Sequence, residues 1–210
     1  MKERPIIFTA ESVRAILAGR KTQTRRLIKL TQFGPSSTPG YEWTFRDKRG
    51  LWNDLTTAKL LAWPRRSWTP YRADDLLWVK EAWCMADPEF ANDGGPKYYF
   101  AATDEGVKTS GFRKDGHPRS PWISPLFMPR SASRITLRVT SVRVERVQAI
   151  SDADAIAEGV EMFDNVDVGI VRHTFGAKAA FAVAWDQINA KRASWARNPW
   201  VWVVAFEVVR

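Results

Sequence analysis

A run of basic and hydroxyl side chains, GRKTQTRR, occupies residues 19–26. Cleavage of an amide needs a nucleophile, and the hydroxyl of Thr24 can serve as one if a base removes its proton. Lys21 can be that base only if its pKa is lowered, and burial and nearby cations such as Arg20 or Arg25 act in that direction. The alternative interpretation is a solvated basic helix end, where cations offset the helix dipole. Contact with phosphate is at least as well supported, because the run holds more cations than that role needs.

The same run lies in a longer pattern that resembles a known family. Residues 15–25, AILAGRKTQTR, resemble the ILxGxKTxTxR opening of ASCH domains. Residues 74–81 (DDLLWVKE), residues 155–159 (AIAEG) and the segment from Trp202 to Val208 support the resemblance. Two stretches, at about 31–70 and 84–130, fall largely outside it. The pattern is therefore most similar to the longer ASCH proteins of phages and prophages.

The resemblance implies a PUA-like fold, which is a small β-barrel with a cleft for RNA or a nucleoside. Some small bacterial ASCH proteins are amidohydrolases that remove the acetyl group from N4-acetylcytidine with a lysine, a threonine and a glutamate. Carried over to this chain, these catalytic residues are Lys21, Thr24 and Glu158. Glu158 would bind the cytosine edge or manage protons on the leaving amine; its alternative is an ordinary solvent-facing residue at a helix end.

The enzymatic hypothesis places a requirement on the backbone between Lys21 and Thr24. Side chains alternate along a regular strand, so residues three apart lie on opposite faces. A turn or twist between these two residues is therefore needed if both are to act on one substrate.

Further basic and aromatic side chains are candidates for contacts with nucleic acid or substrate. They are Arg20, Arg25, Arg26, Trp78, Lys80, Arg130 and Arg134. Alternation places Trp78 and Lys80 on one face of an expected strand, although the tryptophan is also a candidate core residue. The alternative role of Arg130 and Arg134 is to discourage aggregation at a strand edge.

The elements that position the first of these residues are indicated by local signals. Residues 5–8 are expected to form a strand, and Thr9 or Ser12 can cap a following helix. That helix carries Val13, Ile16 and Leu17 on one face. Gly19 is expected to end it, because glycine adopts a left-handed cap at little cost.

The remaining elements follow from periodicity and turn residues. Strands are expected at 76–79, 97–101, 134–147 and 200–208, with a bulge or bend in the third. Helices are expected at 151–159 and at about 178–191, the second with Ala182, Trp185 and Ile188 on one face. Residues 31–70 and 84–130 are expected to be insertions or long loops. The order predicts an α+β fold around a curved mixed sheet or small barrel with flanking helices.

Composition limits the class of protein. The 210 residues predict a single domain, 1–210, and the net charge of +9 favours RNA, a modified nucleoside or another polyanionic partner. A lone cysteine, Cys84, indicates a reducing, cytoplasmic location. Neither a signal peptide nor a membrane segment is expected. Two isolated histidines and the lack of a phosphate-binding loop predict no metal and no cofactor; protein partners are not indicated.

Three functions remain open from the basic residues together with what the resemblance to ASCH domains implies. The first is a metal-independent amidohydrolase that acts on an N4-acetylcytidine-like cytosine. The second is a non-catalytic reader of RNA or modified nucleic acid. The third is a metal-independent ribonuclease, which would have to use Lys, Arg or Thr for proton transfer.

Overall fold

The computed structural model describes residues 3–28, 33–46, 51–62, 70–85, 98–104, 122–160, 166–168, 171–173 and 176–209. Two compact units divide the chain. Unit 1 comprises Met1–Lys21, Asp75–Arg138 and Glu207–Arg210; unit 2 comprises Thr22–Asp74 and Val139–Phe206. The expected single domain with two insertions stays a prediction.

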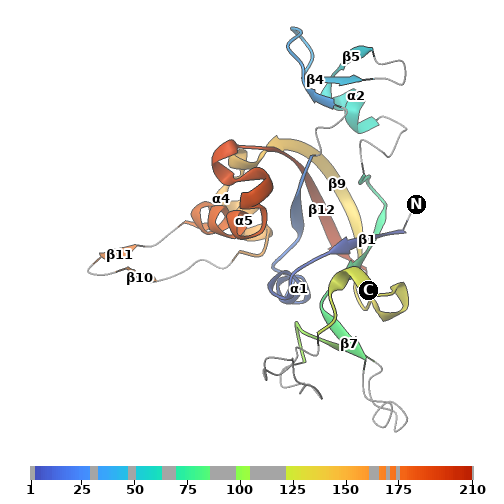
Figure 1. Cartoon of the computed structure of the whole chain (residues 1–210), viewed down its shortest axis with the longest axis vertical. Coiled ribbons are helices and arrows are strands. Elements are labelled where there is room, and N and C mark those ends of the chain that lie inside the picture. Colours follow the sequence, from blue (N-terminus) through green and yellow to red (C-terminus); the bar gives the residue numbers. More distant parts are fainter. Residues whose placement is uncertain are drawn as a thin grey trace, which may run out of the picture. The chain divides into compact units, whose positions relative to one another are not determined.

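The largest sheet has five strands in the order β1-β6-β9-β12-β2. Their bounds are β1 Glu3–Ile7, β6 Leu76–Lys80, β9 Thr136–Arg146, β12 Trp200–Val208 and β2 Gln23–Leu27. β1 and β6 run parallel, whereas β6 pairs antiparallel with β9 and β12 with β2. Figure 1 shows β9 as a curved strand. The α+β class and a mixed sheet are thus confirmed, but the strands of the described residues form no closed barrel.

Unit 1 begins with β1 and the helix α1 (Ala10–Leu17). The backbone N–H of Ser12 donates to the Thr9 hydroxyl, which caps the helix as expected, and Gly19 has a left-handed φ of 71°. Val13 and Ile16 are buried, but Leu17 is exposed, so its predicted core position was wrong. Leu17 is the last residue of α1, and Ala15 is buried instead of it.

A second core in unit 1 lies beside two short strands, β7 (Trp83–Met85) and β8 (Tyr98–Phe100). Two 3-10 turns, η1 (Pro125–Phe127) and η2 (Arg130–Ala132), complete this part of the unit. The core consists of Trp83, Phe100, Met128 and Ala132, with Tyr98 packed against it. The strand expected near 97–101 is confirmed as β8.

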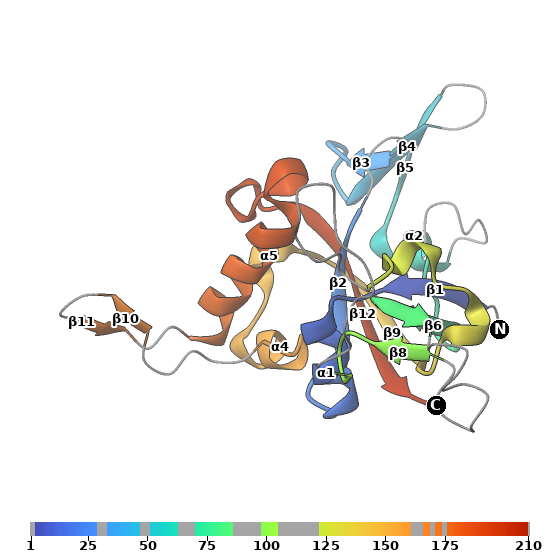
Figure 2. The same cartoon turned by 60° about the horizontal axis from the view of Figure 1, so that its bottom comes forward.

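Unit 2 contains a small antiparallel sheet within the stretch expected to be an insertion or long loop. It consists of β3 (Phe33–Pro35), β4 (Trp43–Arg46) and β5 (Trp52–Leu55), and α2 (Thr57–Ala62) follows it. Figure 2 shows the three strands side by side. Trp43 is buried, its indole N–H donates to the Thr57 hydroxyl, and its ring lies 4.8 Å from that of Trp200. The loop expectation was therefore wrong for these residues.

The main core of unit 2 packs two helices against β12. Its helical elements are η3 (Val147–Ala149), α4 (Asp152–Ala157), α5 (Ala177–Ala193) and η4 (Trp195–Arg197). Along the chain, α4 and α5 are separated by two paired antiparallel strands, β10 (Val166–Val168) and β11 (Val171–His173). Both cartoon views place α4 beside α5 (Figures 1 and 2). The cluster includes Phe181, Trp185, Val201 and Val203. No helix in the described ranges has both the length and the apolar character needed to cross a membrane.

The buried face of α5 differs from the expected one. Trp185 is buried as predicted, but Ile188 is exposed and Phe181 takes the neighbouring core position. Ala177 and Phe181 share a face with Trp185 because they precede it by eight and four residues, close to whole helical turns.

We expect Phe181→Ala to lower the free energy of unfolding by about 3–5 kcal/mol, because it removes a large ring from this core. Ile188→Ala on the exposed face of the same helix should change it by less than about 0.5 kcal/mol. Urea unfolding followed by tryptophan fluorescence measures both values. Equal losses in the two variants would contradict the assigned helix face.

Candidate functional site

Half of the residues in the basic motif run are buried. Lys21 is 5% exposed and Thr24 is 4% exposed, and Gln23 and Arg25 are also buried. Arg20, by contrast, is exposed at the turn after α1. β2 starts at Gln23 and pairs with β12, which places Thr24 opposite Val204. A solvated basic helix end is therefore the wrong description of residues 21–25.

Lys21 is the last residue of unit 1. Its backbone N–H donates to the carbonyl of Ala15, and its ammonium lies 5.7 Å from the centre of the Phe8 ring. Thr22 continues the β2–β12 register, because its carbonyl accepts from the backbone N–H of Phe206. The turn or twist required between Lys21 and Thr24 stays a prediction. Convergence of Lys21 with Thr24 and Glu158 stays a prediction, because these two residues belong to unit 2.

The guanidinium of Arg25 lies among three carboxylates within unit 2. Its Nη1 donates to Oε1 of Glu158, and its Nη2 donates to Oε2 of Glu145 and to Oδ2 of Asp154, each over 3.1 Å. The side chain has no exposed surface. The Arg25 guanidinium therefore lies wholly within the protein and is bound to carboxylates, and its expected role as a substrate or nucleic-acid contact stays a prediction.

Arg143 adds a second cation to this group, which we call the Arg25 network: Arg25, Arg143, Glu145, Asp154 and Glu158. Arg143 pairs with Glu145, and its Nη2 donates to Oδ2 of Asp154 over 2.9 Å. Two positive and three negative side chains thus form a group in which negative charge is in excess by one and every carboxylate contacts a guanidinium. The alternation of Arg143 and Glu145 on β9 is visible in the sequence, but their partners on other elements are not.

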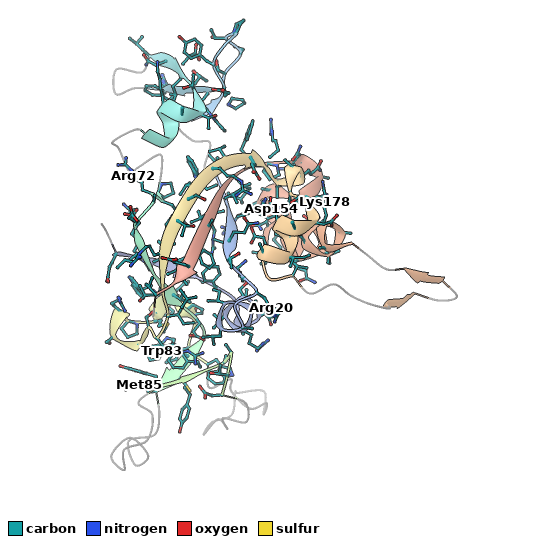
Figure 3. All side chains as sticks on the ribbon, turned by 180° about the vertical axis from the view of Figure 1, so that it is seen from behind. Arg20, Arg72, Trp83, Met85, Asp154 and Lys178 are labelled. Carbon is teal, nitrogen blue, oxygen red and sulfur yellow. The ribbon has the colours of Figure 1, made fainter. Side chains whose placement is uncertain are left out.

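The helix α4 delivers two of these carboxylates. Ser151 caps it by accepting from the backbone N–H of Asp154, and Glu158 is its C-terminal cap before Gly159, whose φ is 81°. Gln23 of β2 donates through Nε2 to both the side chain and the backbone carbonyl of Asp154. Figure 3 shows Asp154 at the edge of the helical layer of unit 2. The cap and the glycine thus set where the carboxylates lie along β2.

The two predicted catalytic residues of unit 2, Thr24 and Glu158, lie on different sides of β2. Gln23 and Arg25 both contact Asp154, so they share one face of the strand, and Thr24 between them points to the other face. Glu158 is 7% exposed and is held through Arg25. Among the described residues, no hydrogen bond joins Thr24 to Glu158 or engages the Thr24 hydroxyl. A substrate that contacts both groups would have to reach around the strand edge.

Arg26 is also less open to a ligand than expected. It is half-buried, and burial lowers the pKa of its guanidinium, an effect that Tyr71 and Glu158 partly offset. The field of Glu158 therefore acts on Arg26 as well as on Arg25.

Three of the predicted contact residues come together in unit 1. The Nζ of Lys80 lies 5.5 Å from the Trp78 ring centre, and the guanidinium carbon of Arg130 lies 5.9 Å from it. Arg130 also pairs with Glu3 over 3.1 Å. The expectation that Trp78 and Lys80 share a face is confirmed by this contact.

Arg134 does not join them. Its Nε and Nη2 donate to the two carboxylate oxygens of the buried Glu81, each over 2.9 Å, and its Nη1 donates to the Thr103 hydroxyl. Its guanidinium also lies 4.0 Å from the Phe100 ring centre. Arg134 is thus half-buried and bound to Glu81, and its expected role as a ligand contact stays a prediction.

Two other features of the described residues lie away from these groups. No cluster of three or more His, Cys, Asp or Glu side chains within the described ranges could hold a metal ion. A hollow of about 290 Å³ is lined by Pro35, Ser37, Thr38, Thr44 and Asp54. It contains none of the residues expected to act on a substrate.

The Arg25 network predicts a dependence of stability on pH. Burial alone would raise the pKa of the Asp154 carboxyl, but the hydrogen bond from Gln23 and the charges of Arg143 and Arg25 outweigh it and lower the pKa. The stabilising contribution of this carboxylate is therefore complete above its unfolded pKa of about 3.9 and is lost as pH falls through the lower folded pKa.

We expect Asp154→Asn to lower the free energy of unfolding near neutral pH by about 1.5–3 kcal/mol, the range for hydrogen bonds to a charged group. The difference from the wild type should shrink as pH falls below about 4. Urea unfolding at a series of pH values measures it. A difference that stays constant down to the lowest pH would contradict the lowered pKa.

Comparison of the chain with models of protein families, with curated proteins and with solved structures gives no match. The resemblance to ASCH domains therefore depends on the motif residues themselves, and the function must be argued from the positions that the structure gives them.

Proposed function

We propose that the chain is a nucleobase-binding protein of the ASCH type that removes an acyl group from N4-acetylcytidine-like modified cytosine, without a metal ion, through Lys21, Thr24 and Glu158. The observation that supports this proposal best is the burial of all three side chains. Removal of a charge from water is costly, so lysine and glutamate are seldom buried, and Glu158 meets this cost by its pairing with Arg25.

The local contacts support a division of roles among the three residues. The Thr24 hydroxyl lies on the β2 face away from the Arg25 network. Glu158 is held by Arg25 at the end of α4, which restricts its rotamers and orients one carboxylate oxygen. A fixed carboxylate suits proton transfer better than a mobile one, since its position is set before the substrate binds.

The proposed reaction has two steps. The Nζ of neutral Lys21 removes the proton of Thr24 as its Oγ1 attacks the acyl carbonyl, and the bond from that carbon to N4 of the base breaks. N4 leaves with a proton as the free amine of cytosine. Water then adds to the acyl-threonine ester, which releases the carboxylic acid and restores Thr24. Glu158 binds the base edge or carries the proton to N4.

We expect the purified protein to convert N4-acetylcytidine to cytidine and acetate, measured by chromatography. Lys21→Ala and Thr24→Ala should each lower kcat by at least about 100-fold, since they remove the base and the nucleophile. Thr24→Ser should retain measurable turnover because it keeps the hydroxyl.

Glu158→Gln has a matched control in Glu81→Gln. Both carboxylates are buried and bind an arginine, Arg25 in one case and Arg134 in the other. A loss of turnover in Glu158→Gln beyond that in Glu81→Gln therefore reports on chemistry rather than on lost stability. The proposal fails if turnover survives both Lys21→Ala and Thr24→Ala, or if the wild type shows none.

Two other results would favour the alternative functions. Binding of RNA without turnover of N4-acetylcytidine would favour a non-catalytic reader. Cleavage of RNA in EDTA that is lost in Lys21→Ala would favour a metal-independent ribonuclease.

A further inference from the structure

We infer that unit 1 carries a binding surface for single-stranded nucleic acid, formed by Trp78, Lys80, Phe127 and Arg130, which we call the Trp78 patch. The proposed function concerns a modified cytosine, and this inference extends its substrate from a free nucleoside to a base within a single-stranded polymer. The inference rests on the proposed function only for the choice of nucleic acid as the ligand.

The patch is built on the outer face of two paired strands. Leu77 and Val79 of β6 are fully buried, whereas Trp78 and Lys80 alternate with them and are partly exposed. The neighbouring strand β1 aligns Pro5 with Trp78 in the parallel register. Figure 2 shows these two strands side by side. The inner face belongs to the core, and the outer face is open along both strands.

The turn η1 carries two exposed apolar side chains and is joined to Lys80 through its backbone. The Nζ of Lys80 donates to the carbonyl of Leu126 over 2.6 Å, which fixes the turn beside Trp78. Phe127 is 74% exposed and Leu126 is 66% exposed. Contiguous exposed apolar side chains rimmed by polar groups are typical of interaction surfaces.

Charge at this face favours an anionic ligand. Lys80 and Arg130 both lie against the Trp78 ring. Glu3 occupies the Nε and Nη2 side of Arg130, and the guanidinium has further donors on its other edge. Lys80 likewise has three donors and uses one on Leu126. Both cations can therefore contact phosphates without loss of these bonds.

Proteins that bind single-stranded nucleic acid combine aromatic side chains with nearby cations. Unpaired bases stack on aromatic side chains, while Lys and Arg follow the phosphates. A duplex keeps its bases stacked on each other and offers only its backbone to such a surface. The Trp78 patch therefore favours a single strand over a duplex.

The test is a fluorescence-anisotropy titration of the full chain with a short fluorescein-labelled single-stranded RNA, with DNA of the same sequence and with an RNA duplex as comparators. We expect Phe127→Ser to weaken binding of the RNA strand roughly 5- to 150-fold, the range for loss of one stacked base. Arg130→Gln should make the plot of log affinity against log salt less steep by about 0.7 if one phosphate contact is lost.

Each variant has a matched control on the same chain. Ile188→Ser removes an equally exposed apolar side chain from α5, outside the patch. Arg14→Gln removes an exposed arginine of α1 that pairs with Glu11, as Arg130 pairs with Glu3. Both controls should bind the RNA strand like the wild type, and Phe127→Tyr should do so because it keeps the ring.

The outcomes separate this inference from the proposed reaction, since unmodified RNA is the probe. Wild-type binding by Phe127→Ser and Arg130→Gln, or stronger binding of the duplex than of the single strand, would overturn the inference. Self-association of the wild type that Phe127→Ser abolishes, with RNA binding unchanged, would assign the patch to a second copy of the chain and overturn it too. Absence of N4-acetylcytidine turnover would contradict the reaction alone.

Discussion

A guanidinium without exposed surface must be neutralised and hydrogen-bonded where it lies, because a buried unpaired charge costs several kcal/mol. Arg25 meets this constraint with three carboxylates that come from β9 and from both ends of α4. Arg25 thus connects β2, at the edge of the sheet, to β9 and to α4. The cap at Ser151 and the glycine at Gly159 fix where α4 begins and ends. They thereby fix the positions of Asp154 and Glu158 relative to Arg25.

The same pairing changes how the basic motif should be understood. A run of cations in a sequence indicates a surface for phosphate, yet here the central arginine binds the protein's own carboxylates. Arg25 holds Glu158 in a fixed position. Arg25 was expected to contact substrate, and here it positions Glu158, which is the proposed catalytic carboxylate. Two partly exposed cations, Lys80 and Arg130, lie beside Trp78 in unit 1, and Arg20 of the motif is exposed at the turn after α1.

Elements with strong local signals could be predicted from the sequence. The cap at Thr9, the turn at Gly19, the β6 and β12 runs and the Ser151–Gly159 helix all depend on neighbours in the chain. The partners of Arg25 and Arg134 could not, because they lie more than 50 residues away and no local pattern selects among many acids. The β3-β5 sheet was missed since strands of three or four residues show too little alternation.

The central claim is that Arg25 and Glu158 form a buried, mutually dependent pair, and a double-mutant cycle tests it most directly. The free energy of unfolding is measured for the wild type, Arg25→Met, Glu158→Gln and the double variant, with Arg138→Gln and Glu207→Gln as an exposed reference pair. We predict a coupling energy of about 1–3 kcal/mol for the buried pair and less than about 1 kcal/mol for the exposed pair. Costs that add to within about 0.5 kcal/mol for Arg25 and Glu158 would contradict the account.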